Sequence, residues 1–211
     1  MYGVGDAGIA AVALAVFQKV SLGMPYGLTA AAIVLSIPLM LVGIRVLGET
    51  NWDNLDYLVI DMPPGTGDIQ LTLAQQVPVT GAVIVTTPQD IALLDARKGL
   101  KMFEKVGIPI LGIVENMSIH ICSKCGHEEH IFGSGGGERM CQDYEVEFLG
   151  ALPLDIAIRE QTDSGKPTVA ADPDGRIAEI YRGIARRVAV KIAEQAKDMT
   201  AKFPNIVIQN T

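Results

Sequence analysis

Cysteine and histidine side chains gather in one short stretch of this 211-residue chain. Five of its six cysteines and histidines fall within eleven positions, namely His120, Cys122, Cys125, His127 and His130. The Cys-x-x-Cys spacing lets two thiolates point at one metal, and the glycine at position 126 permits the tight turn that this needs. The pattern predicts a metal site, with two free thiols in a loop as the alternative.

The kind of metal centre stays open between two possibilities. A single zinc ion could take Cys122 and Cys125 together with two histidines, His127 and His130, from one chain. A four-iron cluster needs four thiolates, and this segment offers two, so a [4Fe–4S] cluster would require two copies of the chain. Cys141 falls on a predicted helix, where we expect it to be a small buried apolar residue.

A second candidate site follows a short apolar strand. Asp61 ends the strand predicted at 57–61 and precedes a Pro-Pro-Gly-Thr-Gly loop that contains Gly65 and Gly67. A carboxylate in this place can hold Mg²⁺ directly or through water, and the N–H groups of a glycine loop can approach a phosphate. The alternative is a Pro/Gly turn with a solvated aspartate, and spacing alone does not separate the two.

Glycines also lie near the start of the sequence, where Gly3 and Gly5 precede an apolar run at 7–17. A glycine loop at the start of a helix suits an anion, because free N–H groups and the helix dipole face it. A working phosphate loop also needs a lysine and a serine or threonine, and Asp6 and Ala7 stand in those places. We expect no strand ahead of this loop to anchor it.

The elements that must position these side chains alternate between strand and helix. The pattern predicts strands at 57–61, 82–86, 109–114 and 147–151, and helices at 69–76, from 90, at 136–144, from 153 and at 173–196. This alternation predicts an α/β fold, a mostly parallel sheet with helices on both faces. Ligands bind such sheets at the carboxyl ends of the strands, which points to Asp61, 86–90, Asn116 and 152–155.

Two connections carry more detail. Asp90 is the predicted N-cap of its helix, and an apolar face follows it, made of Leu93, Ala96, Leu100 and Phe103. Residues 117–137, which include the cysteine pair, are predicted to form one long loop.

The first fifty residues differ from the rest of the chain. Their net charge is zero, whereas residues 51–211 carry the whole net charge of −7. We interpret them as buried α/β core, with a helix over about 7–20 and a strand over about 28–36. One alternative is a membrane hairpin, because 27–44 is uncharged and at the lower edge of a transmembrane length. A secretory signal is disfavoured, since no basic segment precedes the apolar run.

Composition limits the classes of function. An apolar content of 49% excludes a disordered chain, and the length favours one domain. A negative net charge without a basic run argues against a nucleic-acid partner. Three cysteines are too few for a disulfide framework, and an odd count fits a reducing, cytoplasmic compartment.

From about residue 51 to 196 the chain resembles the Mrp/ApbC family of iron–sulfur cluster carriers, part of the MinD-like, deviant Walker A group of P-loop ATPases. Six strings carry the resemblance in the family's order: 56–68 around the aspartate, Val-Thr-Thr-Pro-Gln-Asp at 85–90, Val-Glu-Asn-Met-Ser at 114–118, Cys-Ser-Lys-Cys-Gly at 122–126, Phe-Gly-Ser-Gly-Gly at 132–136 and Leu-Gly-Ala-Leu-Pro-Leu-Asp at 149–155. The cysteine pair is specific to this branch.

The resemblance implies a three-layer α/β/α P-loop NTPase fold and roles for several residues. Asp61 matches the Walker B acid, and Gly65 to Gly67 match the switch II loop. Asn116 matches a residue that contacts the adenine base.

The cysteine pair has the most specific implied role. Cys122 and Cys125 match the pair that bridges a [4Fe–4S] cluster across a homodimer. The expected function is a cluster carrier that serves apo-proteins as clients, in a family that binds and hydrolyses ATP. A membrane partner is not expected.

The first fifty residues resemble the family only as a degenerate copy. Gly3 and Gly5 stand where the family has its phosphate loop, but both lysines, the serine and the threonine are absent. The switch I aspartates are also missing from 29–33. We therefore expect ATP and Mg²⁺ to bind weakly or not at all, with little or no hydrolysis. One domain would comprise this portion (1–50), a Walker B and cysteine portion (51–198) and a tail (199–211).

Overall fold

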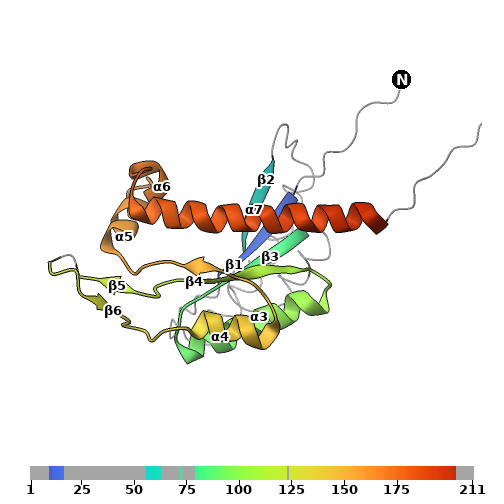
Figure 1. Ribbon diagram of the computed structural model, residues 1–211, viewed down its shortest axis with the longest axis horizontal. Helices are drawn as coiled ribbons and strands as arrows, with labels where there is room; N and C mark the ends of the chain where they lie inside the picture. Colours follow the sequence, from blue (N-terminus) through green and yellow to red (C-terminus); the bar gives the residue numbers. More distant parts are fainter. Residues whose placement is uncertain (1–9, 17–55, 63–71, 73–78, 123, 203–211) are drawn as a thin grey trace, which may run out of the picture.

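Short apolar runs rich in valine and isoleucine form a parallel sheet, because β-branched side chains suit a pleated surface. The computed structural model describes residues 10–16, 56–62, 72, 79–122 and 124–202, with backbone alone for 10–16 and 196–202. In these residues five strands pair in the order β2-β1-β3-β4-β7 (Figure 1). They are β1 (Ala10–Val16), β2 (Tyr57–Met62), β3 (Val79–Thr86), β4 (Ile110–Glu115) and β7 (Phe148–Ala151).

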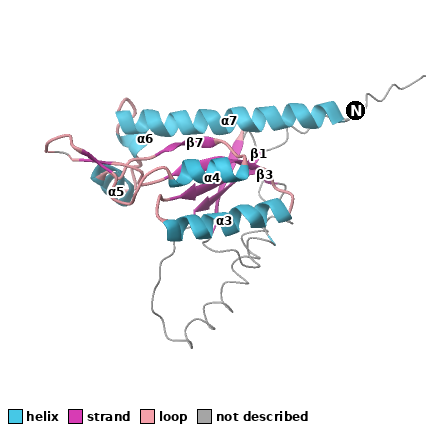
Figure 2. Ribbon diagram, turned by 60° about the horizontal axis from the view of Figure 1, so that its bottom comes forward, coloured by secondary structure: helices cyan, strands magenta, loops and turns pink. Residues whose placement is uncertain are grey.

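Helices cover both faces of this sheet. One face carries α3 (Asp90–Lys105) and α4 (Gly136–Tyr144), and α7 (Arg176–Lys202) crosses the other (Figures 1 and 2). Two shorter helices, α5 (Ile156–Asp163) and α6 (Thr168–Ala171), lie beside the start of α7. The three-layer α/β/α arrangement expected from the sequence is confirmed.

The core is split by the sheet into two apolar clusters. Ala82 and Ile84 of β3 belong to the cluster under α3 and α4, whereas Val83 belongs to the cluster under α7. This division follows from the alternation of side chains along a strand. Leu100 and Phe103 of α3 are fully buried in the first cluster, where each contributes about 1.5–3 kcal/mol.

Downstream of residue 56 the predicted elements are mostly confirmed. The strands predicted at 57–61, 82–86, 109–114 and 147–151 correspond to β2, β3, β4 and β7. The helices predicted from 90, at 136–144, from 153 and at 173–196 correspond to α3, α4, α5 and α7. The predicted apolar face of α3, with Leu93, Ala96, Leu100 and Phe103, is buried.

The helix predicted over about 7–20 is wrong where the structure describes it. Residues 10–16 form β1, which pairs in parallel with both β2 and β3. An apolar run without charges fits a buried helix and a buried strand equally well. Pairing with strands much later in the chain decides between them, and periodicity cannot report that pairing.

Two further predictions need correction. Gln89, not Asp90, is the N-cap of α3, and Asp90 lies in the first turn, where its charge favours the helix dipole. The segment 117–137 is not one loop, because β5 (His120–Ile121) and β6 (Glu128–Glu129) form an antiparallel hairpin within it. α6 was not predicted at all.

Some predictions fall outside the described residues: Gly3, Gly5, the uncharged stretch 27–44 with its strand, Gly65, Gly67 and nearly all of the helix at 69–76. Among the helices that the structure describes, none combines the length and the apolar composition needed to cross a bilayer.

Candidate metal centre and strand-end site

The two cysteines lie in a tight turn at the end of the β5–β6 hairpin. The N–H of Cys122 donates to the carbonyl of His127 at 2.9 Å, and the N–H of Gly126 donates back to the carbonyl of Cys122 at 2.8 Å. Gly126 has a φ of +71°, a conformation that residues with a side chain rarely adopt. The glycine after the second cysteine therefore closes the turn, as its position in the sequence indicates.

The surroundings of the Cys122 thiol favour its ionised form. The backbone N–H groups of Lys124 and Cys125, followed by the Cys125 side chain, lower the pKa of the Cys122 thiol below its ordinary 9.0. A smaller lowering comes from the charge of His120. Cys122 is half-buried and Cys125 is exposed. The turn thus favours an accessible thiolate, the form that binds metals.

Two of the three histidines of this segment face backbone carbonyls. Nδ1 of His120 lies 3.0 Å from the carbonyl oxygen of Leu154, and Nδ1 of His130 lies 2.8 Å from that of Ser118. Since a carbonyl only accepts, Nδ1 is the donor in both rings. Among the described residues no three His, Cys, Asp or Glu side chains gather around one point. The four ligands of the zinc alternative are therefore not brought together.

Asn116 follows β4 at the carboxyl edge of the sheet. Its N–H donates to the carbonyl of Thr86 at 2.7 Å and ties the ends of β3 and β4 together. Its Oδ1 accepts the N–H of Met117 at 2.9 Å, and Met117 has a positive φ of 55°. This turn leads the chain from the end of β4 into the β5–β6 hairpin that carries the cysteines.

Asp61 lies at the same edge but farther across the sheet. It is exposed on β2, in register with Leu14 of β1. Since β1 and β3 separate β2 from β4, Asp61 lies about 14 Å from the end of β4 at normal strand spacing. The structure therefore does not bring it together with Asn116 or the cysteine pair. The amino end of β1, which Gly3 and Gly5 precede in the chain, is at the opposite edge of the sheet.

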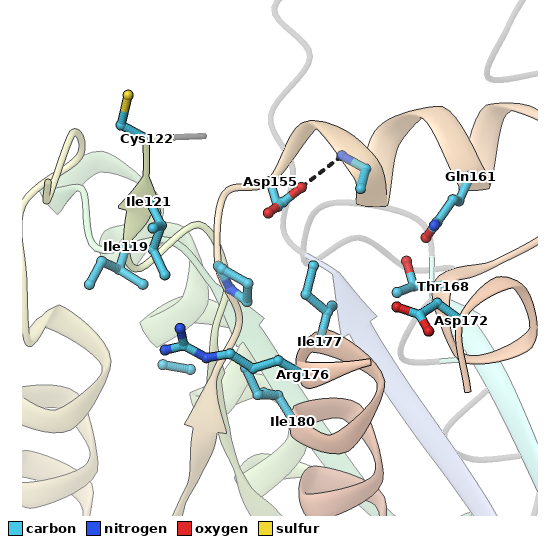
Figure 3. Close-up of a pocket in the computed structure, with 13 residues that line it drawn as sticks. Ile119, Ile121, Cys122, Asp155, Gln161, Thr168, Asp172, Arg176, Ile177 and Ile180 are labelled. Atoms are coloured by element: carbon cyan, nitrogen blue, oxygen red, sulfur yellow. Dashed lines mark hydrogen bonds between the residues drawn. The ribbon is translucent and has the colours of Figure 1, made fainter. Parts of the chain in front are cut away.

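A pocket of about 550 Å³ opens between Cys122, the end of β7, α5, α6 and the start of α7 (Figure 3). Thr168 Oγ1 and Gln161 Oε1 are buried there without a hydrogen-bond partner in the described part of the chain. Asp155 caps α5 by accepting the N–H of Ala157 at 2.8 Å. The sulfur of Cys122 points away from the pocket. Buried polar atoms left unpaired cost about 1–3 kcal/mol each, so the pocket suits a polar ligand.

The sequence pointed to part of this pocket and missed the rest. Asp155 belongs to the predicted strand-end region at 152–155, whereas Thr168 and Gln161 were not singled out. Neither residue has a distinctive spacing, and only the packing of α5 against α6 places them together.

Comparison with known proteins agrees with this fold and these motifs. A family profile of the ParA group, described as the NUBPL iron-transfer P-loop NTPase, matches residues 5–189. This chain belongs to that family. The iron–sulfur cluster carrier protein of Pseudomonas fragi is 66% identical over 142 residues, which is 67% of this chain and 50% of that protein. The resemblance to iron–sulfur carriers is confirmed.

Other members of the P-loop NTPase family show the same partial overlap. The Escherichia coli K12 iron–sulfur cluster carrier protein is 61% identical over 153 residues, 72% of this chain and 42% of that protein. The mouse iron–sulfur cluster transfer protein NUBPL is 49% identical over 148 residues, 70% of this chain and 46% of that protein. The chain spans about half the length of these relatives.

Solved structures confirm the P-loop NTPase fold. A nucleotide-binding protein of Archaeoglobus fulgidus in complex with ADP matches with a TM-score of 0.56 and 27% identity, over 81% of this chain and 79% of that one. An ATP complex of a Cyanothece McdA variant matches with a TM-score of 0.54 at 12% identity, over 87% and 86% of the two chains, and shows the fold alone.

Proposed function

We propose that this chain carries iron–sulfur clusters, holding one [4Fe–4S] cluster between two copies of itself and passing it to apo-proteins. The observation that carries the proposal is the cysteine turn. It presents two accessible sulfurs, and its N–H groups favour the thiolate of Cys122. Relatives named iron–sulfur cluster carrier or transfer protein support the same cargo.

The count of usable thiols supports a homodimer. The chain has three cysteines, and the third, Cys141, lies on the buried face of α4 and is 6% exposed. Burial, followed by the charge of Glu138, raises the pKa of the Cys141 thiol to about 11, so it is a poor metal ligand. Two thiolates per chain leave a four-iron cluster half-ligated, and a second copy would complete the set.

Transfer to a client would proceed by exchange of thiolate ligands. Each Fe–S bond to Cys122 or Cys125 that breaks is replaced by a bond from iron to a client thiolate. The proton that leaves the client thiol goes to the released cysteine, and the iron and sulfide keep their oxidation states. A lowered pKa makes Cys122 a good leaving group in this exchange.

Anaerobic reconstitution tests the proposal. We expect about four irons and four sulfides per dimer, lost in Cys122→Ala and kept in the matched variant Cys141→Ala. One zinc per chain, lost on His127→Ala or His130→Ala, would instead establish the zinc alternative. A colourless, iron-free monomer after loading would overturn the cluster proposal.

The second ligand that we propose is a nucleotide, and the proposal covers only the binding of its base and ribose. The pocket with Thr168 and Gln161 offers unpaired polar groups at the strand-end edge, beside the loop that Asn116 begins. The ADP-bound relative supports this ligand class. Thr168→Val should weaken binding of a fluorescent adenosine nucleotide by about 5- to 10-fold. Unchanged binding would exclude this pocket.

The phosphate end does not fit the residues present. The glycines that match the phosphate loop precede the amino end of β1, and no lysine accompanies them. We therefore assign no hydrolytic step, and a role for Asp61 in holding Mg²⁺ remains a prediction. ATP hydrolysis should be very weak or absent. Robust hydrolysis that Asp61→Ala abolishes would contradict this.

A further inference from the structure

Glu115, the last residue of β4, is a buried carboxylate with 2% of its surface exposed. Its Oε1 accepts the hydroxyl of Ser118 at 2.7 Å, and its Oε2 accepts the N–H of Gly137 at 2.6 Å. No Lys or Arg pairs with it in the described part of the chain. Because burial of a carboxylate is costly without partners, these two hydrogen bonds are what makes its position tolerable.

The two partners of Glu115 are the ends of one segment. The cysteine-bearing segment, residues 118–137, leaves the sheet after β4, forms the β5–β6 hairpin and returns at α4. Ser118 begins it and Gly137 ends it. A single carboxylate thus holds the start and the end of the segment that presents the thiols.

The chain is closely packed at the end of the cysteine-bearing segment, around Gly137. A Cβ on Gly137 would lie 3.1 Å from Cβ and 3.2 Å from Oε2 of Glu115. The backbone of Gly137 can approach the Glu115 side chain this closely because glycine has no side chain. A Cβ on Gly136 would lie 2.7 Å from the carbonyl oxygen of Pro88. Both glycines start α4, whose dipole favours a carboxylate at this end. Gly136, the last residue of the string Phe-Gly-Ser-Gly-Gly, and Gly137 after it therefore have a structural role at the base of the hairpin.

A second hydrogen bond also holds Ser118, at the start of the segment. His130 donates from Nδ1 to the carbonyl oxygen of Ser118 at 2.8 Å. Ser118 also donates its N–H to the carbonyl of Leu152 at 3.0 Å, which anchors it to the end of β7. The carboxylate of Glu115 is the one group described here that reaches both ends of the segment.

We propose that Glu115 is a positioning residue for the cysteine pair. By holding Ser118 and Gly137 together, it fixes the direction in which Cys122 and Cys125 are presented to the cluster. The inference rests on the proposed carrier function and adds a residue to it that touches neither the iron nor the sulfide.

Two substitutions separate the effect of the length of the Glu115 side chain from the effect of its charge. Glu115→Gln keeps the reach, because its amide oxygen can accept from Gly137 while its NH₂ donates to the hydroxyl of Ser118. Glu115→Asp keeps the charge but is one methylene shorter, and cannot span both ends. We call the joint hold of Glu115 on Ser118 and Gly137 the clamp. If the clamp matters, Glu115→Gln should preserve the function and Glu115→Asp should not. If only the negative charge matters, Glu115→Asp should preserve the function and Glu115→Gln should not.

The first test follows iron release to a chelator, and the visible spectrum of the cluster, in the anaerobically loaded dimer. Glu115→Asp should release iron about 10- to 100-fold faster than the parent, the range seen when a partner that orients a metal ligand is lost. Glu115→Gln should stay within about threefold of the parent. Ile113→Val, on the same strand and fully buried, is the control for lost stability, with parent-like release. Equal release from Ile113→Val and Glu115→Asp would overturn the clamp.

The second test needs no iron. Hydrogen exchange of the metal-free chain should protect the N–H groups of Cys122 and Gly126, which are hydrogen-bonded in the turn. Glu115→Asp should speed exchange throughout 118–137 and leave α3 unchanged. If the parent never binds iron, the proposed carrier function is wrong, but hydrogen exchange of the metal-free chain still tests the clamp. If the parent loads iron but Glu115→Asp changes neither exchange nor release, the clamp fails and the carrier function stands.

Discussion

The cysteine-bearing segment and the α3–α4 layer treat the same residue type in opposite ways. In the turn of the β5–β6 hairpin, backbone N–H groups lower the pKa of Cys122. On the buried face of α4, burial raises the pKa of Cys141 to about 11. Loss of solvent disfavours a thiolate, whereas directed hydrogen bonds favour it. The contrast shows that surroundings, rather than residue type, decide which sulfur is available for chemistry.

The two regions are also held together by different forces. The turn of the hairpin is exposed, and its order rests on hydrogen bonds worth about 0.5–1.5 kcal/mol each. The α3–α4 layer rests on fully buried side chains such as Leu100, Phe103 and Met140. Changes that remove chemistry should therefore be separable from changes that remove stability, and the following predictions test that separation.

The largest effect should come from the hairpin. The double substitution Cys122→Ser and Cys125→Ser should abolish iron binding, because hydroxyls do not replace thiolates as iron ligands. The free energy of unfolding of the metal-free chain should change by less than about 0.5 kcal/mol, since the turn buries little. Iron analysis and denaturant unfolding measure the two. A large loss of stability would mean that the regions are not separable.

The next largest effect should come from the layer. Leu100→Ala removes a fully buried side chain and should lower the free energy of unfolding by about 2–5 kcal/mol. The rate at which iodoacetamide alkylates Cys122 in the folded chain should not change. A changed rate at unchanged folding would show that the core also shapes the turn.

Thiol reactivity should then separate the cysteines by pH. A thiol with a pKa of about 11 rather than 9.0 holds about one-hundredth as much thiolate at pH 7. Cys122 should therefore be alkylated at least about 100-fold faster than Cys141, with its half-maximal rate below pH 9. Mass spectrometry of alkylated peptides gives both rates, and similar rates would contradict the contrast.

The raised pKa of Cys141 also predicts how the free energy of unfolding changes with pH. Below pH 9 the thiol is protonated in both the folded and the unfolded chain, so its contribution is fully present. As the pH rises from 9.0 toward about 11, the unfolded chain ionises first, and stability falls. Cys141→Ala should remove this part of the alkaline loss.

The smallest effect should come from the surface of the layer. Arg97 of α3 and Asp143 of α4 form an ion pair at 3.3 Å, with both side chains over 40% exposed. Arg97→Ala should cost only about 0.2–1 kcal/mol in thermal or denaturant unfolding, because water and salt screen such a pair. Iron binding should be unaffected. A loss as large as that of Leu100→Ala would mean that this pair is not an ordinary surface pair.

The sequence by itself determined the features that depend on local spacing. The tight turn at the cysteine pair is readable from Cys122, Cys125 and the glycine after them, because such a turn involves only neighbouring residues. The strands are readable from short apolar runs, and the buried face of α3 is readable from a period of 3.6 residues. The family is readable from short strings in a fixed order.

Tertiary structure decided the features that depend on pairing between distant segments. Residues 10–16 are a strand because β2 and β3 lie on either side of them. Glu115 holds both ends of the cysteine segment because α4 returns to the end of β4. Thr168 and Gln161 meet only where helices pack. Local propensity is insensitive to such contacts, because the free energy that fixes them is released only when remote parts of the chain exclude water together.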